Sequence, residues 1–313
     1  MTYAIETRAL RYRPGKSFAL DDLSLHVPAG AIYGFLGPNG AGKTTTIRLL
    51  LGLLKPAGGS VEVLGLAIPA KVSEALSRIG YVPERPHLHV SLTVAESIRF
   101  HSAFFPTWDQ RWASELLKRF GLKEHRGLRS LSKGEMGKLM ITLALGQRPE
   151  LLVLDEPTDG LDPVVRRELL SALLDYVSDR QATVFISSHL IHELERVCDW
   201  VGVLDQGKLL TEMPMQTFKS GIKRLAVTNP PRVRADAPFS VLGREPRAGG
   251  GETWSVRGWE PGMERYFAEN GSLLREIVDL DLEEAFVELL RTARNAPGDM
   301  ALPADAKENL IHV

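Results

Sequence analysis

The most restrictive feature of this sequence is a glycine-rich segment at residues 37–45, which reads GPNGAGKTT. It follows an apolar run at 31–36, typical of a buried strand, and a helical pattern begins near Gly42. Strand, glycine-rich loop and helix in this order fit the pattern G-x-x-x-x-G-K-[ST], in which backbone N–H groups turn inward around phosphates. The helix N-terminus adds positive potential at the same point. The segment therefore predicts a phosphate-binding loop, and the alternative is an ordinary glycine-rich turn.

The side chains of this segment indicate which groups of a nucleotide it binds. Lys43 is expected to reach the outer phosphates, and Thr44 is expected to ligate Mg²⁺. The other residues expected to contact the nucleotide are Gly37, Asn39, Gly40, Gly42 and Thr45. The predicted ligands are therefore ATP and Mg²⁺.

A second apolar run, LLVLD at 151–155, is followed by another acidic residue, so that Asp155 and Glu156 stand together. Four apolar residues predict a buried strand, and Asp155 at its end is placed to hold the magnesium shell. Glu156, beside the metal, can orient and deprotonate an attacking water, so it is the predicted general base. The alternative interpretation is a solvated acidic turn before Pro157.

Further short apolar runs indicate the fold class. Strand-like segments occur at 3–8, 18–27, 183–187 and 200–204, and helical patterns accompany the later ones. This alternation predicts an α/β fold with parallel strands covered by helices.

Between about residues 85 and 149 the strand pattern disappears and three helix starts take its place. Each matches the capping box S/T-x-x-E/Q: Thr93 with Glu96, Thr107 with Gln110, and Ser132 with Glu135. We interpret this region as a helical subdomain inserted in the sheet. Asp162 followed by Pro163 predicts a further helix start.

After about residue 211 the composition changes, because prolines and the glycine triplet at 249–251 interrupt short strand-like pieces. We predict an ATP-binding domain at 1–220, a small C-terminal α+β domain at 221–295, and a disordered tail at 296–313. The C-terminal domain is expected to close with a helix capped by Asp281.

The composition limits the partners and the location of the protein. Lys plus Arg total 38 against 39 for Asp plus Glu, a net charge of −1, so we expect no nucleic acid partner. Cys198 is the only cysteine, which suits a reducing compartment such as the cytoplasm. No stretch approaches the roughly 18–20 apolar residues that span a bilayer. If the protein works at a membrane, another chain must supply the spans.

Four motifs in a specific order resemble the ATP-binding subunits of ABC transporters: GPNGAGKTT at 37, LSKGE at 131, LLVLDEPTDGLDP at 151 and ISSH at 186. The resemblance covers roughly residues 3–220 and implies a P-loop NTPase core with a mixed sheet and an antiparallel β edge. It also implies that Tyr12 stacks on adenine, that 160–162 form the D-loop, and that His189 senses the γ-phosphate. By the same resemblance, Ser132 and Gly134 face the γ-phosphate of ATP bound to a partner subunit.

Two positions depart from the family pattern. The usual LSGGQ reads LSKGE at 131–135, so that Ser132 and Gly134 are retained. The alternative is that Ser132 and Glu135 form only a capping box, although both roles can hold together. Glu84 stands where the family usually has Gln; it can still contact Mg²⁺ but adds a charge and loses an amide donor. Similar substitutions, and an ending like DLEEAF at 281–286, occur in the exporter-type branch.

The resemblance implies a head-to-tail homodimer or heterodimer of ATP-binding subunits. It further implies a separate integral membrane permease that holds the protein on the inner face of the cell membrane, with export as the expected direction. A soluble ABC-type switch that acts on ribosomes or DNA is a rival class, although the chain has a single cassette and no heptad run. The presence of all four of Lys43, Asp155, Glu156 and His189 argues against a purely regulatory nucleotide binder. The lack of an N-K-x-D motif argues against a GTPase.

Overall fold

The computed structural model describes residues 2–15, 19–234, 236–247 and 250–295. The chain divides into two compact units, Met1–Met213 and Pro214–Val313. The domain boundaries inferred from the sequence remain predictions, and the predicted tail at 296–313 lies outside the described residues.

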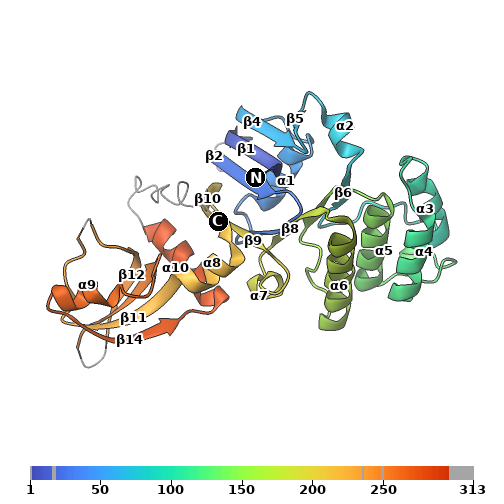
Figure 1. Cartoon of the computed structure of the whole chain (residues 1–313). Coiled ribbons are helices and arrows are strands. Elements are labelled where there is room, and N and C mark those ends of the chain that lie inside the picture. Colours follow the sequence, from blue (N-terminus) through green and yellow to red (C-terminus); the bar gives the residue numbers. More distant parts are fainter. Residues whose placement is uncertain (1, 16–18, 235, 248–249, 296–313) are drawn as a thin grey trace. The chain divides into compact units, whose positions relative to one another are not determined.

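The first unit contains a four-stranded sheet near the N-terminus, in the order β2-β1-β4-β5 (Figure 1). Its strands are β1 (Tyr3–Tyr12), β2 (Leu20–Pro28), β4 (Gly58–Val63) and β5 (Leu66–Ile68). All three neighbouring pairs are antiparallel. This sheet is the antiparallel β edge expected from the sequence.

A six-stranded sheet in the order β10-β9-β3-β8-β7-β6 forms the centre of the first unit. Its strands are β3 (Ile32–Leu36), β6 (Ile79–Val82), β7 (Leu151–Asp155), β8 (Thr183–Ser188), β9 (Trp200–Asp205) and β10 (Lys208–Pro214). The pairs β3–β8, β3–β9, β6–β7 and β7–β8 are parallel. The predicted mixed α/β fold is therefore confirmed, and the carboxyl ends of β3, β7 and β8 meet at one edge of the sheet.

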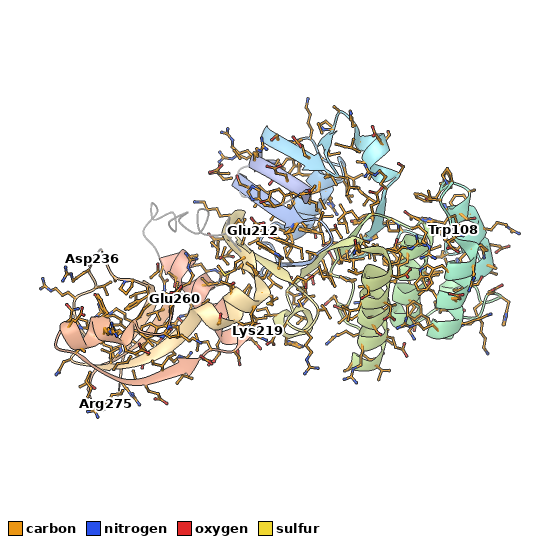
Figure 2. All side chains as sticks on the ribbon, in the orientation of Figure 1. Trp108, Glu212, Lys219, Asp236, Glu260 and Arg275 are labelled. Carbon is orange, nitrogen blue, oxygen red and sulfur yellow. The ribbon has the colours of Figure 1, made fainter. Side chains whose placement is uncertain are left out.

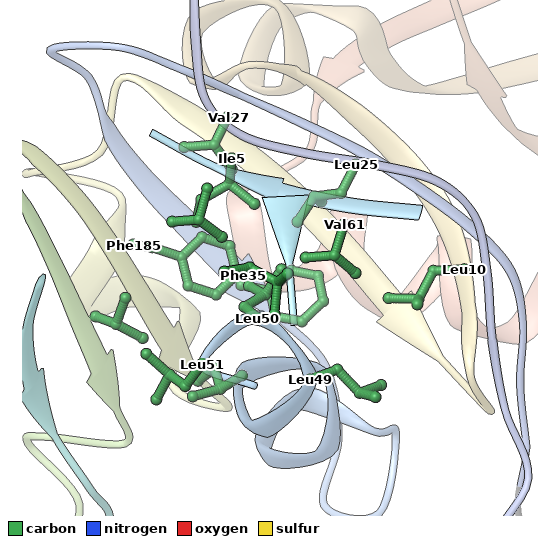
Figure 3. Close-up of a cluster of buried hydrophobic side chains, with 14 of the residues drawn as sticks. Ile5, Leu10, Leu25, Val27, Phe35, Leu49, Leu50, Leu51, Val61 and Phe185 are labelled. Carbon is green, nitrogen blue, oxygen red and sulfur yellow. The ribbon is translucent and has the colours of Figure 1, made fainter. Parts of the chain in front are cut away.

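The main core lies between these two sheets and helix α1 (Lys43–Leu50) (Figure 3). The rings of Phe35 on β3 and Phe185 on β8 are 5.1 Å apart, and both side chains are fully buried. Ile5 and Leu25 of the antiparallel sheet belong to the same cluster. Burying side chains of this size stabilises the fold by about 1.5–3 kcal/mol each, so the strand that leads into residues 37–42 is held firmly.

A partly buried acidic side chain connects the two sheets. Glu212 of β10, labelled in Figure 2, accepts hydrogen bonds from the backbone N–H of His26 at 2.7 Å and from the Tyr33 hydroxyl at 2.8 Å. Burial raises the pKa of Tyr33 well above its ordinary value, and the charge of Glu212 adds to the effect. The phenol therefore stays protonated and donates to this carboxylate.

Three helices follow β6 and form the inserted helical region: α3 (Val94–Ser102), α4 (Gln110–Phe120) and α5 (Lys133–Gly146), with a 3₁₀ turn, η1 (Leu128–Ser130), before α5. The capping boxes predicted at Thr93 and Ser132 are confirmed. The predicted cap at Thr107 is wrong. Asp109 caps α4 by accepting from the backbone N–H of Trp112, while the Thr107 hydroxyl donates to a carbonyl at residue 147.

Trp108, labelled in Figure 2, explains why α4 is capped by Asp109 and not by Thr107. Its indole packs against α5 so closely that a Cβ at Gly146 would lie 2.6 Å from the ring. The chain is therefore fixed at Trp108 before α4 can begin, and the carboxylate at position 109 is the next available cap.

The remaining helices of the first unit are α2 (Val72–Leu76), α6 (Pro163–Arg180) and α7 (Ile191–Leu194). Asp162 caps α6 through the N–H groups of Val164 and Val165, with Pro163 at the first helical position, as predicted. Among the described residues, no helix has the length and apolar character needed to cross a membrane.

The second unit is an α+β fold with a four-stranded sheet in the order β12-β13-β11-β14. Its elements are α8 (Met215–Gly221), β11 (Ile222–Thr228), β12 (Ser240–Pro246), β13 (Glu252–Arg257), α9 (Glu264–Glu269), β14 (Leu273–Asp279) and α10 (Leu282–Asn295). Trp254 and Phe267 are fully buried in its core. Asp281 accepts from the backbone N–H of Glu284 at 2.8 Å, which confirms the predicted cap of α10.

Candidate functional site

The glycine-rich loop runs from the end of β3 to the start of α1. Gly37 approaches the backbone of Leu204 so closely that a Cβ would lie 2.4 Å from that carbonyl oxygen. Gly42, the N-cap of α1, has a φ of 115°, which side chains rarely tolerate. These two glycines allow the loop to curl over the N-terminus of α1, where free N–H groups favour an anion.

Lys43 is held inside this curl, and its side chain is only 6% exposed. Its ammonium group donates to the carbonyl of Gly37 at 2.6 Å and to that of Pro38 at 3.3 Å. It also lies 3.0 Å from Oε1 of Glu156. The charge of Lys43 is therefore oriented toward the loop before any ligand binds.

The end of strand β7 places Asp155 directly beneath the loop. Its Oδ1 accepts from the hydroxyl of Thr44 at 3.1 Å and from that of Ser187, on β8, at 2.8 Å. Burial raises the pKa of Asp155 above its ordinary value, these two hydrogen bonds oppose the rise, and the charges of Glu156 and Glu84 add to it. Hydroxyl and carboxylate oxygens from α1, β7 and β8 thus converge at this point.

Glu156 follows in an uncommon backbone conformation with a φ of 48°. Its backbone N–H donates to Oγ of Ser187 at 3.1 Å, which holds the turn after β7 against β8. Oε2 lies 2.8 Å from Nδ1 of His189, and because a carboxylate only accepts, Nδ1 is the donor. Buried Oε1 has no hydrogen bond, although it lies 3.0 Å from the Lys43 ammonium. Such strain at a polar site is typical of functional residues.

These groups border a cleft of about 430 Å³. Its lining residues are Pro38, Asn39, Gly40, Gly42, Lys43, Thr44, Thr45, Glu84, Glu156, Asp159 and His189. Most of the residues that the sequence predicted for nucleotide binding therefore lie together. Asp155 lies behind Thr44 and is 1% exposed, and Gly37 lies at the base of the loop.

Besides Asp155 and Gly37, three predicted residues do not line this cleft. Tyr12, at the end of β1, is half-buried and packs against the main core. Ser132 and Gly134 lie at the N-terminus of α5, where the Ser132 hydroxyl accepts from the backbone N–H of Glu135 at 3.2 Å. The structure thus gives Ser132 a capping role within its own chain.

Two polar residues of the site were not predicted. Ser187 lies in the ISSH segment and binds Asp155, and Asp159 lies in the DEPTDGLD segment and lines the cleft. Both residues lie inside motifs that were recognised from the sequence. Their closeness to the predicted residues within those motifs was the sequence feature that could have identified them.

Comparison with known proteins agrees with this geometry. The family model described as "ABC transporter" matches residues 20–159. The bacitracin transport ATP-binding protein BcrA of Bacillus licheniformis is 36% identical over 301 residues, which cover 93% of this chain and 98% of BcrA. The chain belongs to the ATP-binding proteins of ABC transporters.

Two further similarities bear on this ABC subunit. A Nod factor export ATP-binding protein of Cupriavidus pinatubonensis is 38% identical over 218 residues, which cover 68% of this chain and 66% of that relative. Among solved structures, an ATP-binding subunit of an ABC transporter matches with a TM-score of 0.63 at 28% identity, over 70% of this chain and 92% of that one. The subunit is therefore an ATPase of the ABC transporter family.

Proposed function

We propose that the cleft between the glycine-rich loop and Glu156 binds ATP with Mg²⁺ and hydrolyses it. The observation that carries this proposal is the approach of Lys43 and His189 to the two oxygens of one buried carboxylate, at 3.0 and 2.8 Å. The triphosphate would lie on the loop, with Lys43 directed at its outer phosphates. Among the carboxylates that line the cleft, Glu156 is the one within hydrogen-bond distance of His189, so the imidazole can orient it toward an attacking water.

The residues around Asp155 fit a magnesium ion, because all of them offer oxygen. The hydroxyl of Thr44 and the carboxylates of Asp155 and Glu84 would hold it, and bound Mg²⁺ would neutralise charge on the phosphates. Among the described residues, no group of three or more His, Cys, Asp or Glu side chains is arranged to hold a metal by itself. This agrees with the usual Mg²⁺ site, where one or two carboxylates act together with substrate phosphates.

Asp155→Asn is expected to stabilise the nucleotide-free protein while it abolishes hydrolysis. Because the pKa of Asp155 is raised in the folded state, its charged form at neutral pH costs stability, and that cost falls as the pH is lowered toward the ordinary value. The amide retains an oxygen for Thr44 and Ser187, so a higher unfolding midpoint is expected. Thermal unfolding without nucleotide measures it, and an equal or lower midpoint would contradict the argument.

We further propose that two subunits pair head to tail around ATP, with Ser132 facing the nucleotide of the partner subunit. The exposed N-terminus of α5 supports this, because it is a second place where free N–H groups favour phosphate. Ser132 can serve as a cap in the single subunit and contact phosphate in the pair.

Ser132→Ala is expected to leave the ATP affinity of a single subunit almost unchanged. It should lower ATP turnover by the pair of subunits at least about tenfold. Thr93→Ala is the matched control, since Thr93 makes the same capping box at the start of α3. Both variants should lose about 1 kcal/mol of stability, but only Ser132→Ala should lose activity. Wild-type turnover in Ser132→Ala would restrict this residue to a cap.

Mixing variants tests the pairing directly. Lys43→Ala subunits combined with Ser132→Ala subunits place both defects in one composite site and leave the other site intact. The mixture should recover part of the activity that each variant lacks alone, provided that one working site suffices. No recovery at any mixing ratio would oppose the head-to-tail pair.

The partner proposed for the pair is an integral membrane permease that holds it on the inner face of the membrane. The helical region supports this with an exposed aromatic surface, on which the rings of His89, Phe100 and Phe104 contact one another in edge-to-face geometry. Phe100 is 51% and Phe104 65% exposed. Exposed apolar side chains that contact one another indicate an interaction site, whereas scattered single ones are ordinary. This surface adjoins the loop that carries Glu84 in the sequence, so it can connect the nucleotide to a partner.

Export is the direction we propose, because the names of two similar proteins specify bacitracin transport and Nod factor export. Co-expression with candidate membrane-spanning chains encoded by neighbouring genes, followed by affinity capture through the subunit, tests the partnership. A spanning chain that never co-purifies, with or without ATP, would contradict it.

A further inference from the structure

Lys133 occupies an unfavourable position for a cation. It is the first residue of α5, where the helix dipole presents its positive end. The family pattern has glycine at this position, so neither capping nor phosphate binding by Ser132 requires a lysine. Its ammonium lies 3.2 Å from Oδ2 of Asp159, which gives the charge a partner.

Asp159 connects this lysine to the nucleotide cleft of the same subunit. It lines the cleft, and its Oδ1 lies 4.0 Å from Nε2 of His189. The other ring nitrogen of His189 lies 2.8 Å from Glu156, and Glu156 lies 3.0 Å from Lys43. A continuous series of polar contacts therefore extends from the start of α5 to the glycine-rich loop.

The loop conformation allows this contact. Gly160 has a φ of 63°, and a Cβ at this position would lie 2.4 Å from the Lys133 ammonium. The lysine thus lies directly over the turn that carries Asp159. Any side chain at Gly160 would have to displace the lysine from the carboxylate.

The charges that line the cleft explain why the ion pair of Lys133 and Asp159 matters for ATP binding. Glu84, Glu156 and Asp159 line the cleft together with a single lysine, Lys43. A triphosphate that enters meets these negative charges, and each one without a counter-charge opposes binding. Lys133 supplies the counter-charge of Asp159 from outside the cleft.

We propose that Asp159 is a positioning residue for His189 and that Lys133 neutralises it, so that the first turn of α5 acts on the nucleotide cleft of its own subunit. This role rests on the proposed ATP site. It differs from that of Ser132, which acts on the ATP of the partner subunit. The same segment of α5 thus serves two sites, one through its N-terminal groups and one through Lys133.

A double-mutant cycle on the full chain tests the proposal, with the affinity for a fluorescent ATP analogue as the first measurement. Lys133→Ala should weaken binding about two- to fivefold, the range expected of an exposed ion pair. Asp159→Asn should leave the affinity close to the wild-type value, because Lys133 already neutralises this carboxylate. In the double variant, the loss of Lys133 should have no further effect. Added salt should reduce the effect of Lys133→Ala, and Lys123→Ala, an exposed lysine of the same helical region, should leave affinity unchanged.

A second measurement separates positioning from a purely structural role. Asp159→Asn should lower kcat about tenfold, because His189 loses one of its two carboxylate neighbours. It should also shift the ¹⁵N signals of the His189 ring, which are assigned by their loss in His189→Ala. Lys133→Arg should retain the wild-type affinity and the wild-type ring signals, because it preserves the charge.

Two results would overturn the proposal. If Lys133→Ala weakens binding equally with and without Asp159, the lysine acts on phosphate directly. If Asp159→Asn leaves kcat and the His189 signals unchanged, Asp159 does not position the imidazole. Either failure leaves the ATP site intact as long as Lys43→Ala still impairs binding, so the two proposals fail separately.

Discussion

Replacing Glu156 with glutamine is expected to lower ATP turnover at least about 100-fold, because the proposed general base is lost. ATP binding should be retained or tightened. The amide fills the same volume and removes a negative charge beside the triphosphate, while one of its two ends can still bind His189 or Lys43. Binding without hydrolysis should accumulate the ATP-bound pair of subunits.

Light scattering after size-exclusion chromatography with Mg-ATP measures the pair, and phosphate release measures turnover. Glu62→Gln provides the matched control, because Glu62 is exposed on β4 in the antiparallel sheet, outside the cleft. The control should turn over ATP at the wild-type rate and should not accumulate the pair. Turnover near the wild-type rate in Glu156→Gln would exclude Glu156 as the base.

The sequence predicted the fold class and most of the cleft because both depend on short-range patterns. The apolar runs at 31–36 and 151–155 form the strands β3 and β7, and each ends at the residue where its polar motif begins. Parallel strands place these ends at one edge of the sheet, so two motifs separated by more than 100 residues meet there. Lys43 and Glu156 are in contact for this reason.

The features that the sequence did not predict depend on packing between distant segments. Thr107 satisfies the capping pattern, but the contact of Trp108 with Gly146 determines where α4 starts. Asp159 lies inside a recognised motif, but its contact with Lys133 exists because the start of α5 lies beside the turn that follows β7. The predicted roles of Tyr12 and Ser132 require a bound nucleotide and a second subunit. The sequence of one chain does not show where either of these lies.

Lys43→Ala is expected to weaken ATP binding about 10- to 100-fold, which corresponds to one charge-assisted hydrogen bond. The lysine is oriented in advance by the carbonyls of Gly37 and Pro38, so little entropy is lost when it contacts phosphate. Its removal also leaves the buried Oε1 of Glu156 without a counter-charge, and this free carboxylate then repels the triphosphate. Both effects act in the same direction.

Titration with a fluorescent ATP analogue measures the loss, and Lys55→Ala, an exposed lysine after α1, is the control for charge alone. The double variant Lys43→Ala with Glu156→Gln separates the two effects. It should recover the part of the affinity that repulsion by Glu156 removes, while the part due to the lost phosphate contact should persist. Full wild-type affinity in Lys43→Ala would mean that the glycine-rich loop is not the nucleotide site.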